Sequence, residues 1–350
     1  MERLVADWDA PWLALAVQRL RGAHAAGRLP GALLIHEQRG TGGAALAQLA
    51  AQLAFCRTSA APCGECRDCR LLRSGQHPDF IRVAPLEDSR LIRVEQIRDL
   101  CEQLALTSHG GGATVALITP ADAMNANAAN ALLKTLEEPR AGVTLILLTS
   151  QPSALPATVL SRCQRLRVPA PGRAAALSWL ESRRGSGPWE AVLDVLGEAP
   201  FEALEVDAPQ IARLQAETRA ALASLEAGTL DIAGTAETWG RAASLELRLA
   251  CVENWLTSRI EEGTRVPRQP RELRSGAHSA AASSELNMTR LLQGLDGLHE
   301  LRRLRLSSVN RPLALEQLLR ELAGASRDGQ GRGPGGQGRA PHTPAAQARR

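Results

Sequence analysis

Four cysteines stand close together in the sequence at a spacing that suits a metal ion. Cys56, Cys63, Cys66 and Cys69 form the pattern C-x6-C-x2-C-x2-C. In a chain with no secretion signal, such a cluster favours a metal over disulfides. Four thiolates suit tetrahedral Zn²⁺ in a closed structural site that leaves no open position for catalysis. The pattern therefore predicts one structural Zn²⁺ per chain.

Two other interpretations of the cysteines stay open. A common iron–sulfur pattern needs a further cysteine four places after Cys69, where Arg73 stands, and unmetallated thiols are the third interpretation. His77 is a fifth candidate ligand, although a capping or surface role is the stronger expectation. Cys101 and Cys251 lie on apolar helical faces and are expected to be core residues.

A glycine-rich turn has the layout of a phosphate-binding loop without its reactive residues. Such a loop reads G-x-x-x-x-G-K-[ST]: backbone amides hold the phosphates, the lysine neutralises them and the hydroxyl binds magnesium. Here Glu37 replaces the first glycine, Gly43 the lysine and Ala44 the hydroxyl residue. Because Lys134 is the only lysine in the chain, no shifted register restores the motif. The degenerate turn thus consists of Gly40, Gly42, Gly43 and Ala44, of which Gly42 alone matches a glycine of the motif.

The second element of an ATPase site is missing as well. An apolar strand should end in two carboxylates that hold magnesium and polarise the attacking water. The apolar run 115–118 ends instead in Thr119 and Pro120, and Asp122 is displaced by three positions. We therefore expect no ATP hydrolysis, no tight Mg-ATP binding and no catalytic residue acting on a nucleotide held by this chain.

The elements that would position these residues predict an α/β domain over residues 1–168. Near-continuous apolar runs alternate with segments of helical periodicity, which indicates a parallel sheet covered on both faces. The zinc module would be an insertion at about 56–69. The expected strands are 32–35, 80–83, 115–118, 143–148 and 166–168, and the expected helices include the apolar positions around 46–53, 94–104 and 129–136.

Beyond the Pro- and Gly-containing segment 169–172 the periodicity is helical throughout. We expect a small helical domain at 169–206 with two or three helices, then a helical domain at 207–324. Asn310 should cap the last helix. Residues 325–350 form a Gly-, Pro- and Arg-rich tail that is expected to be disordered.

Charge gives little reason to expect nucleic-acid binding by the folded body. The net charge is +4, and residues 327–350, with five Arg and one Asp, carry all of it. The tail alone could add weak, salt-sensitive attraction to nucleic acid. Without a long apolar run or a signal-peptide pattern at the N-terminus, we expect the cytoplasm and no membrane contact.

Two further segments carry a resemblance to a known family. These are the segment 127–139, which reads NAANALLKTLEEP, and Leu160-Ser161-Arg162-Cys163. Together with the cysteine cluster, with Gly75-x-His77-Pro78-Asp79 and with Val309-Asn310-Arg311, the chain resembles the clamp-loader branch of the AAA+ ATPases. The specific motifs cover about residues 30–168, and the C-terminal part is similar in helical type only.

The resemblance implies a subunit of the DNA polymerase III clamp loader that does not itself hydrolyse ATP. The small domain would be a lid, the last domain an oligomerising collar, and Arg162 an arginine finger supplied to a neighbour's ATP site. The implied partners are the gamma/tau ATPase subunits, delta, and, through the complex, the sliding clamp and primer-template DNA. The broken ATP motifs argue against a gamma/tau subunit.

Other interpretations remain beside this one. The chain could be an independent nucleotidase or kinase with a divergent phosphate site, or a zinc-ribbon nucleic-acid binder. The missing lysine and carboxylates weigh against the first, and the mixed charge and lack of aromatics around Cys63–Cys69 weigh against the second. Composition alone would make 132–139 an amphipathic helix ended by Pro139, with Lys134 and Glu138 paired, and Arg162 a surface ion pair.

Overall fold

The structure is a computed structural model that describes residues 8–58, 60–86, 89–106, 112–264, 277–304 and 310–327. The chain divides into two compact units, Met1–Ala212 and Arg213–Arg350. The segment 169–206 therefore lies in the same unit as the α/β part. Most of the expected tail, residues 328–350, lies outside the described residues.

The first unit is built on a parallel sheet of five strands. The strands are β1 (Ala32–His36), β2 (Phe80–Val83), β3 (Thr114–Ile118), β4 (Val143–Thr149) and β5 (Gln164–Arg167). Their order is β2-β3-β4-β1-β5, and every neighbouring pair is parallel. The prediction of an α/β fold is confirmed, and each predicted strand is correct to within two residues at either end.

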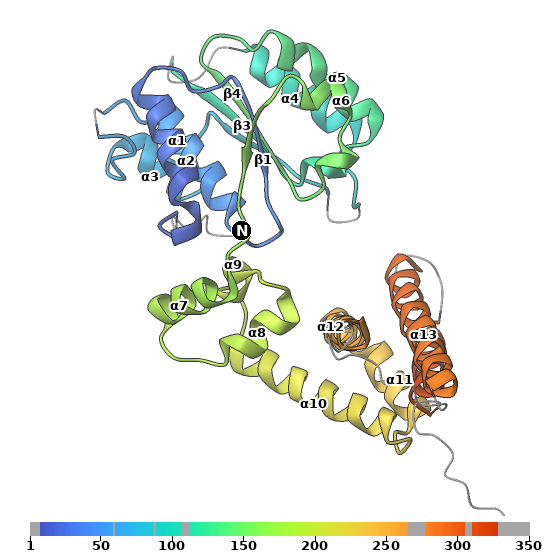
Figure 1. The fold of residues 1–350 in the computed structure, drawn as a ribbon. Helices are drawn as coiled ribbons and strands as arrows, with labels where there is room; N and C mark the ends of the chain where they lie inside the picture. The colour runs from blue at the N-terminus through green and yellow to red at the C-terminus, as the bar shows by residue number, and fades with distance from the viewer. Residues whose placement is uncertain are drawn as a thin grey trace, which may run out of the picture. The chain divides into compact units, whose positions relative to one another are not determined.

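Helices cover both faces of this sheet, as expected for strands that are apolar along their whole length. Figure 1 shows α1 (Ala14–Ala25), α2 (Gly43–Phe55) and α3 (Arg67–Arg73) on one side. On the other side lie α4 (Val94–Ala105), α5 (Ala126–Glu137) and α6 (Ala157–Leu160). Short 3-10 helices lie at Pro11–Leu13, Ala121–Ala123 and Pro152–Ala154. The α4–α5 side is closed by buried apolar residues that include Ile97, Leu100, Leu132, Leu145 and Leu147.

Three helices complete the first unit: α7 (Arg173–Arg184), α8 (Trp189–Leu196) and α9 (Pro200–Ala203). Trp179 of α7 and Phe201 of α9 are in contact, with ring centroids 4.7 Å apart. Trp12 packs edge-on against both rings, at 5.4 and 6.2 Å. An aromatic cluster thus joins this helical segment to the start of the chain. The next helix, α10 (Ala208–Glu226), continues into the second unit.

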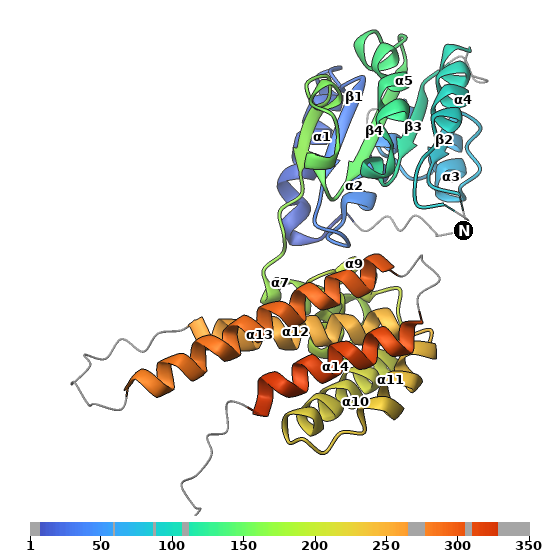
Figure 2. The ribbon, with the colours of Figure 1, turned by 90° about the vertical axis from the view of Figure 1, so that its right-hand side faces the viewer.

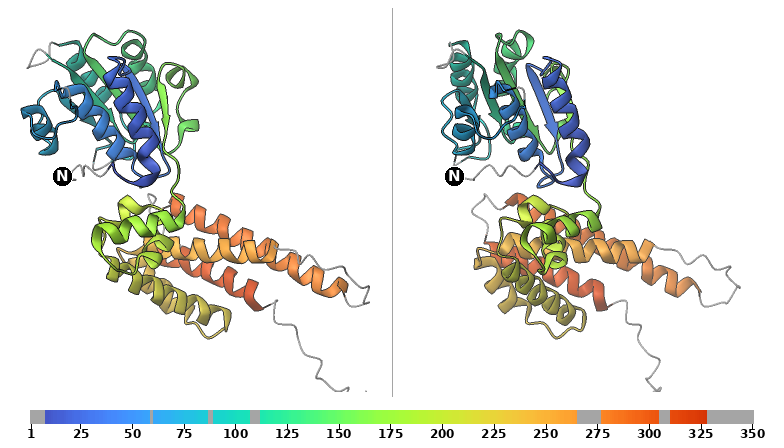
Figure 3. Two further views of the ribbon diagram at one scale, coloured as in Figure 1. Left: turned by 60° about the vertical axis from the view of Figure 1, so that its left-hand side comes forward. Right: turned by 90° about the vertical axis from the view of Figure 1, so that its left-hand side faces the viewer.

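Every other described element of the second unit is a helix (Figures 2 and 3). These are α11 (Ile232–Arg241), α12 (Leu245–Thr264), α13 (Ala277–Leu304) and α14 (Arg311–Arg327). Their shared core includes Trp239, Leu249, Leu256, Leu298, Leu315 and Leu319. A Cβ built on Gly240 would stand 2.8 Å from the backbone nitrogen of Pro312, so only glycine allows α11 and α14 to approach so closely.

The last helix confirms one prediction and corrects another. The Oδ1 atom of Asn310 accepts a hydrogen bond from the amide of Leu313 at 3.4 Å, as expected of an N-cap. The helix continues to Arg327, three residues past the expected limit of 324. Among the described residues, no helix is long and apolar enough to span a bilayer.

Candidate functional sites

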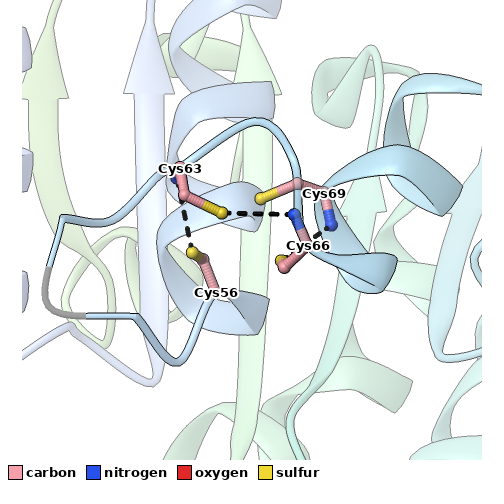
Figure 4. A group of neighbouring side chains, drawn as sticks. All are labelled: Cys56, Cys63, Cys66 and Cys69. Atoms are coloured by element: carbon pink, nitrogen blue, oxygen red, sulfur yellow. Dashed lines mark hydrogen bonds between the residues drawn. The ribbon is translucent and has the colours of Figure 1, made fainter.

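The four clustered cysteines converge in space. Cys56 ends α2, Cys63 lies in the following loop, Cys66 caps α3 and Cys69 lies within it. Their Sγ atoms all lie within 4.8 Å of one another (Figure 4). Tetrahedral Zn²⁺ with Zn–S bonds of about 2.3 Å would need sulfurs ~3.8 Å apart. All four residues are free thiols in this fold, so the cluster fits a Cys₄ metal centre rather than disulfides.

Backbone amides donate hydrogen bonds to three of the cysteine sulfurs. The amide of Cys63 points at Sγ of Cys56 at 3.4 Å, and the amide of Cys66 points at Sγ of Cys63 at 3.3 Å. Hydrogen bonds from the Cys66 and Glu65 amides lower the pKa of Cys63 to about 6, whereas burial raises the pKa of Cys69 to about 12. Because all four ligands bind as thiolates, a metal would have to deprotonate Cys69 itself.

His77 is not one of the four converging groups, although it packs nearby. Its ring stacks on Phe55 with centroids 3.8 Å apart, and its Nδ1 accepts a hydrogen bond from the amide of Asp79 at 3.2 Å. Its Nε2 lies 3.7 Å from the carboxylate of Asp68, and burial lowers its pKa. The histidine therefore fixes the end of α2 against the loop before β2, as a packing and capping residue.

The glycine-rich turn, residues 37–44, connects β1 to α2 as expected. The side chain of Glu37 folds back onto this turn. Oε2 of Glu37 accepts a hydrogen bond from the amide of Gly43 at 2.6 Å, and the Thr41 hydroxyl lies 3.5 Å from it. Glu37 is 8% exposed. Burial raises the pKa of Glu37, and hydrogen bonds from the amides of Gly43, Gly42 and Thr41 oppose that rise.

The outer side of the same turn is covered by α9 and by the start of the chain. The amide of Phe201 donates to the carbonyl of Gly40 at 3.0 Å, and Trp12 Nε1 donates to the carbonyl of Thr41 at 2.7 Å. A Cβ built on Gly42 would stand 2.7 Å from the Phe201 ring. Ala44, which replaces the magnesium-binding hydroxyl residue, is exposed.

The end of β3 carries no carboxylate, and Asp122 is engaged elsewhere. Its Oδ1 accepts hydrogen bonds from the Thr149 hydroxyl and, at 3.2 Å, from the amide of Ser150. Asp122 therefore ties the turn after β3 to the end of β4. Thr119 and Pro120 stand where the two carboxylates of an ATPase strand would be.

Arg162 lies just after α6 and is held by α5. Its guanidinium forms an ion pair with Glu137 through Nε, at 2.9 Å, and through Nη2. Nη1 donates to the carbonyl of Thr158 at 3.0 Å, and one third of the arginine side chain is exposed. Cys163 is buried and burial raises its pKa to about 11, so it is a core residue.

The α5 segment differs in one detail from the expected helix. The helix ends at Glu137, and Glu138, the expected i,i+4 partner of Lys134, leaves helical geometry as its C-cap. At the other end, Oδ1 of Asn125 accepts from the amide of Ala128 at 2.8 Å. Asn125 precedes an apolar periodic segment, which is a sequence signal for an N-cap. No comparable sequence signal indicated that Glu37 would accept a hydrogen bond from the amide of Gly43.

The part of the chain that carries these motifs is similar to known proteins. Residues 13–171 match the family described as DNA polymerase III, delta subunit. Subunit delta' of DNA polymerase III from Pseudomonas aeruginosa is 40% identical over 213 residues, which are 59% of this chain and 65% of that protein. The Escherichia coli K12 subunit delta' is 37% identical over 188 residues, 53% of this chain and 56% of that protein. The matched part of this chain is thus similar to delta-prime subunits.

A second group of similar proteins consists of tau subunits. DNA polymerase III subunit tau of Escherichia coli is 36% identical over 146 residues, 41% of this chain and 22% of that protein. The Pseudomonas aeruginosa and Escherichia coli delta-prime subunits thus match over a longer segment than this tau subunit does. The matched part still spans less than two thirds of the length of either delta-prime relative.

Proposed function

We propose that this chain is a non-catalytic, delta-prime-type subunit of a DNA polymerase III clamp loader. It would act as a stator that helps the ATP-driven subunits load the sliding clamp onto primer-template DNA. The observation that carries the proposal is the similarity to delta-prime subunits combined with a phosphate-type turn that is filled by Glu37. Its partners would be the gamma/tau ATPase subunits and delta, in the cytoplasm.

The absence of an ATPase activity of its own is part of this proposal. The turn lacks a lysine and a magnesium hydroxyl, β3 ends without carboxylates, and Asp122 is bound to Thr149. A nucleotide phosphate would have to displace a buried carboxyl group that already holds the amide of Gly43. These features oppose the alternative of an independent nucleotidase or kinase, which measured ATP turnover by the isolated chain would support.

The cysteine cluster would hold one structural Zn²⁺ that fixes the loop between α2 and α3. Cys56, Cys63, Cys66 and Cys69 supply the four thiolates of a closed site, and no fifth donor converges with them among the described residues. Residues 169–206 would form the lid and 207–324 the collar through which the subunits associate. Both assignments rest on the resemblance and on the helical character of these segments.

Arg162 is the residue that we propose acts on a neighbour. An arginine placed against the charge developing on a transferred phosphoryl group accelerates ATP hydrolysis by stabilising that charge. In the single chain the guanidinium is paired with Glu137 at the surface. Exposed pairs of this kind are worth about 0–1 kcal/mol, so a neighbour's phosphate could readily replace the carboxylate.

The assembly itself is testable in cells of the source organism. The full-length chain, tagged at its N-terminus and expressed from its own locus, should co-purify with the organism's gamma/tau and delta subunits, identified by mass. The tagged chain should retain these partners through size-exclusion chromatography. Recovery of the chain alone, or with unrelated partners only, would contradict the proposed function.

A further inference from the structure

The turn at residues 37–44 is filled on its inner side. A glycine-rich turn that opens a helix presents backbone amides to an anion, which is why phosphates bind there. In this chain the amide of Gly43, at the start of α2, donates to Oε2 of Glu37 at 2.6 Å. A Cβ built on Gly43 would stand 2.5 Å from the Glu37 Cδ atom, so the carboxyl group packs directly onto the turn.

The same turn is closed on its outer side by residues from both ends of the first unit. The backbone of Gly40 is hydrogen-bonded to Phe201 of α9, and a Cβ on Gly40 would stand 2.6 Å from Cβ of Ala199. Trp12 holds the carbonyl of Thr41, and Arg39 pairs with Glu202 at 2.6 Å. The carbonyls of Gly40 and Thr41 and the amide of Gly43 are thus all hydrogen-bonded to this chain's own residues.

We propose that Glu37 is a built-in substitute for phosphate, and that the turn works as a fixed joint between the α/β core and α9. The carboxyl group satisfies the amides that a nucleotide phosphate would otherwise satisfy. The α9 segment is then held on the turn without any nucleotide, so its position does not depend on an ATP cycle. The contacts involved lie within this chain, so the isolated chain is enough to test the role of Glu37, whichever partners the chain binds.

The test removes the internal anion and offers an external one. In full-length Glu37→Ala the amides of the turn lose a buried acceptor, which should lower the Tm by roughly 3–8 °C. Sulfate at 50 mM, compared with chloride at equal ionic strength, should then raise the Tm of the variant by ~3 °C more than that of the wild type. In ¹H–¹⁵N spectra, sulfate should shift the amides of Thr41, Gly42 and Gly43 in the variant only.

Two matched variants separate this effect from general salt stabilisation. Glu205→Ala removes an exposed carboxylate from the same unit and should respond to sulfate as the wild type does. Glu37→Gln keeps an oxygen acceptor for the Gly43 amide and should be neither strongly destabilised nor rescued. Folding of Glu37→Ala in sulfate but not in chloride would support the proposal.

Three results would overturn it. The first is equal sulfate stabilisation of Glu37→Ala, Glu205→Ala and the wild type. The second is a Glu37→Ala chain that folds in neither salt while Glu37→Gln unfolds as readily. The third is a sulfate-induced shift of the Thr41, Gly42 and Gly43 amides in the wild type, which would mean that the anion position is open.

Discussion

At the scale of single residues, the proposal depends on one residue in this chain's own phosphate-type turn and on one that would act in a neighbour's ATP site. Glu37 closes the one, whereas Arg162 would serve the other. Arg162 forms an ion pair with Glu137 at the molecular surface, next to the end of α5. Such a pair contributes at most about 1 kcal/mol to folding, which predicts that Arg162 can be replaced without unfolding the chain.

Arg162→Ala should lower DNA- and clamp-stimulated ATP hydrolysis by the reconstituted complex. At the single site that the arginine completes, the loss should be about 10³-fold or more, so total turnover should fall by that site's share. Arg162→Lys should restore little, since an ammonium cannot reproduce the two-pronged contact of a guanidinium. Steady-state ATPase assays on complexes of identical composition measure both effects.

Two controls make the assay specific. Arg165→Ala removes another exposed arginine three residues further on, whose Nη2 donates to the carbonyl of Leu160 at 3.4 Å, and it should leave turnover unchanged. Glu137→Gln should free Arg162 and preserve turnover. Equal rates for the wild type and Arg162→Ala would leave Arg162 as a surface ion pair.

At the scale of elements, the loop between α2 and α3 is the segment that would depend on the proposed Zn²⁺. Cys66→Ser removes the ligand that also caps α3, so the chain should lose its one Zn²⁺ and residues 56–73 should loosen. The sheet should remain folded, because the buried cluster that closes its α4–α5 side includes none of the four cysteines. Elemental analysis together with amide hydrogen exchange measures both changes.

Cys101→Ser is the matched control for this variant. Cys101 is half-buried, and its Sγ accepts a hydrogen bond from the Thr135 hydroxyl at 3.3 Å, so its loss should leave the zinc content at one ion per chain. An iron-containing wild-type chain, or a wild-type chain without any metal, would be incompatible with the zinc prediction.

Helices and strands could be predicted from the sequence where their buried positions require a regular pattern of apolar residues. The strands of the sheet interior are apolar along their length, and α4 and α5 bury one regular stripe each. The helix α1 gave no comparable signal, because it buries only Ala16 and Leu20. Short α3 is organised by the cysteines rather than by periodicity. The converging cysteines were predictable because their spacing is local.

What could not be predicted is the filling of the turn at 37–44. The replacement of a glycine by Glu37 is visible in the sequence, but it does not show that the side chain folds back onto the amide of Gly43. The cover supplied by Phe201 comes from a residue about 160 positions away, so no local pattern encodes it. The loss of the ATP motifs could therefore be predicted from the sequence. The proposed role of the turn as a joint to α9 could not.

For the whole molecule, these features predict a chain that binds no nucleotide tightly by itself. Calorimetric titration of the isolated full-length chain with Mg-ATP should give no micromolar Kd. Gly43→Lys alone should not restore binding, since a Cβ at that position would stand 2.5 Å from Glu37 and 2.7 Å from Leu148. Micromolar affinity in the wild type, or turnover that is lost on mutating Gly42, would disprove the prediction.

Clamp loading by a complex with and without this chain tests the central claim most directly. The gamma/tau and delta subunits and the sliding clamp from the same organism would be combined on primed circular DNA, and the loaded clamps counted after gel filtration. We predict ATP-dependent loading only when this chain is present, although it hydrolyses no ATP alone. Loading that proceeds equally well in its absence would contradict its role as a clamp-loader subunit.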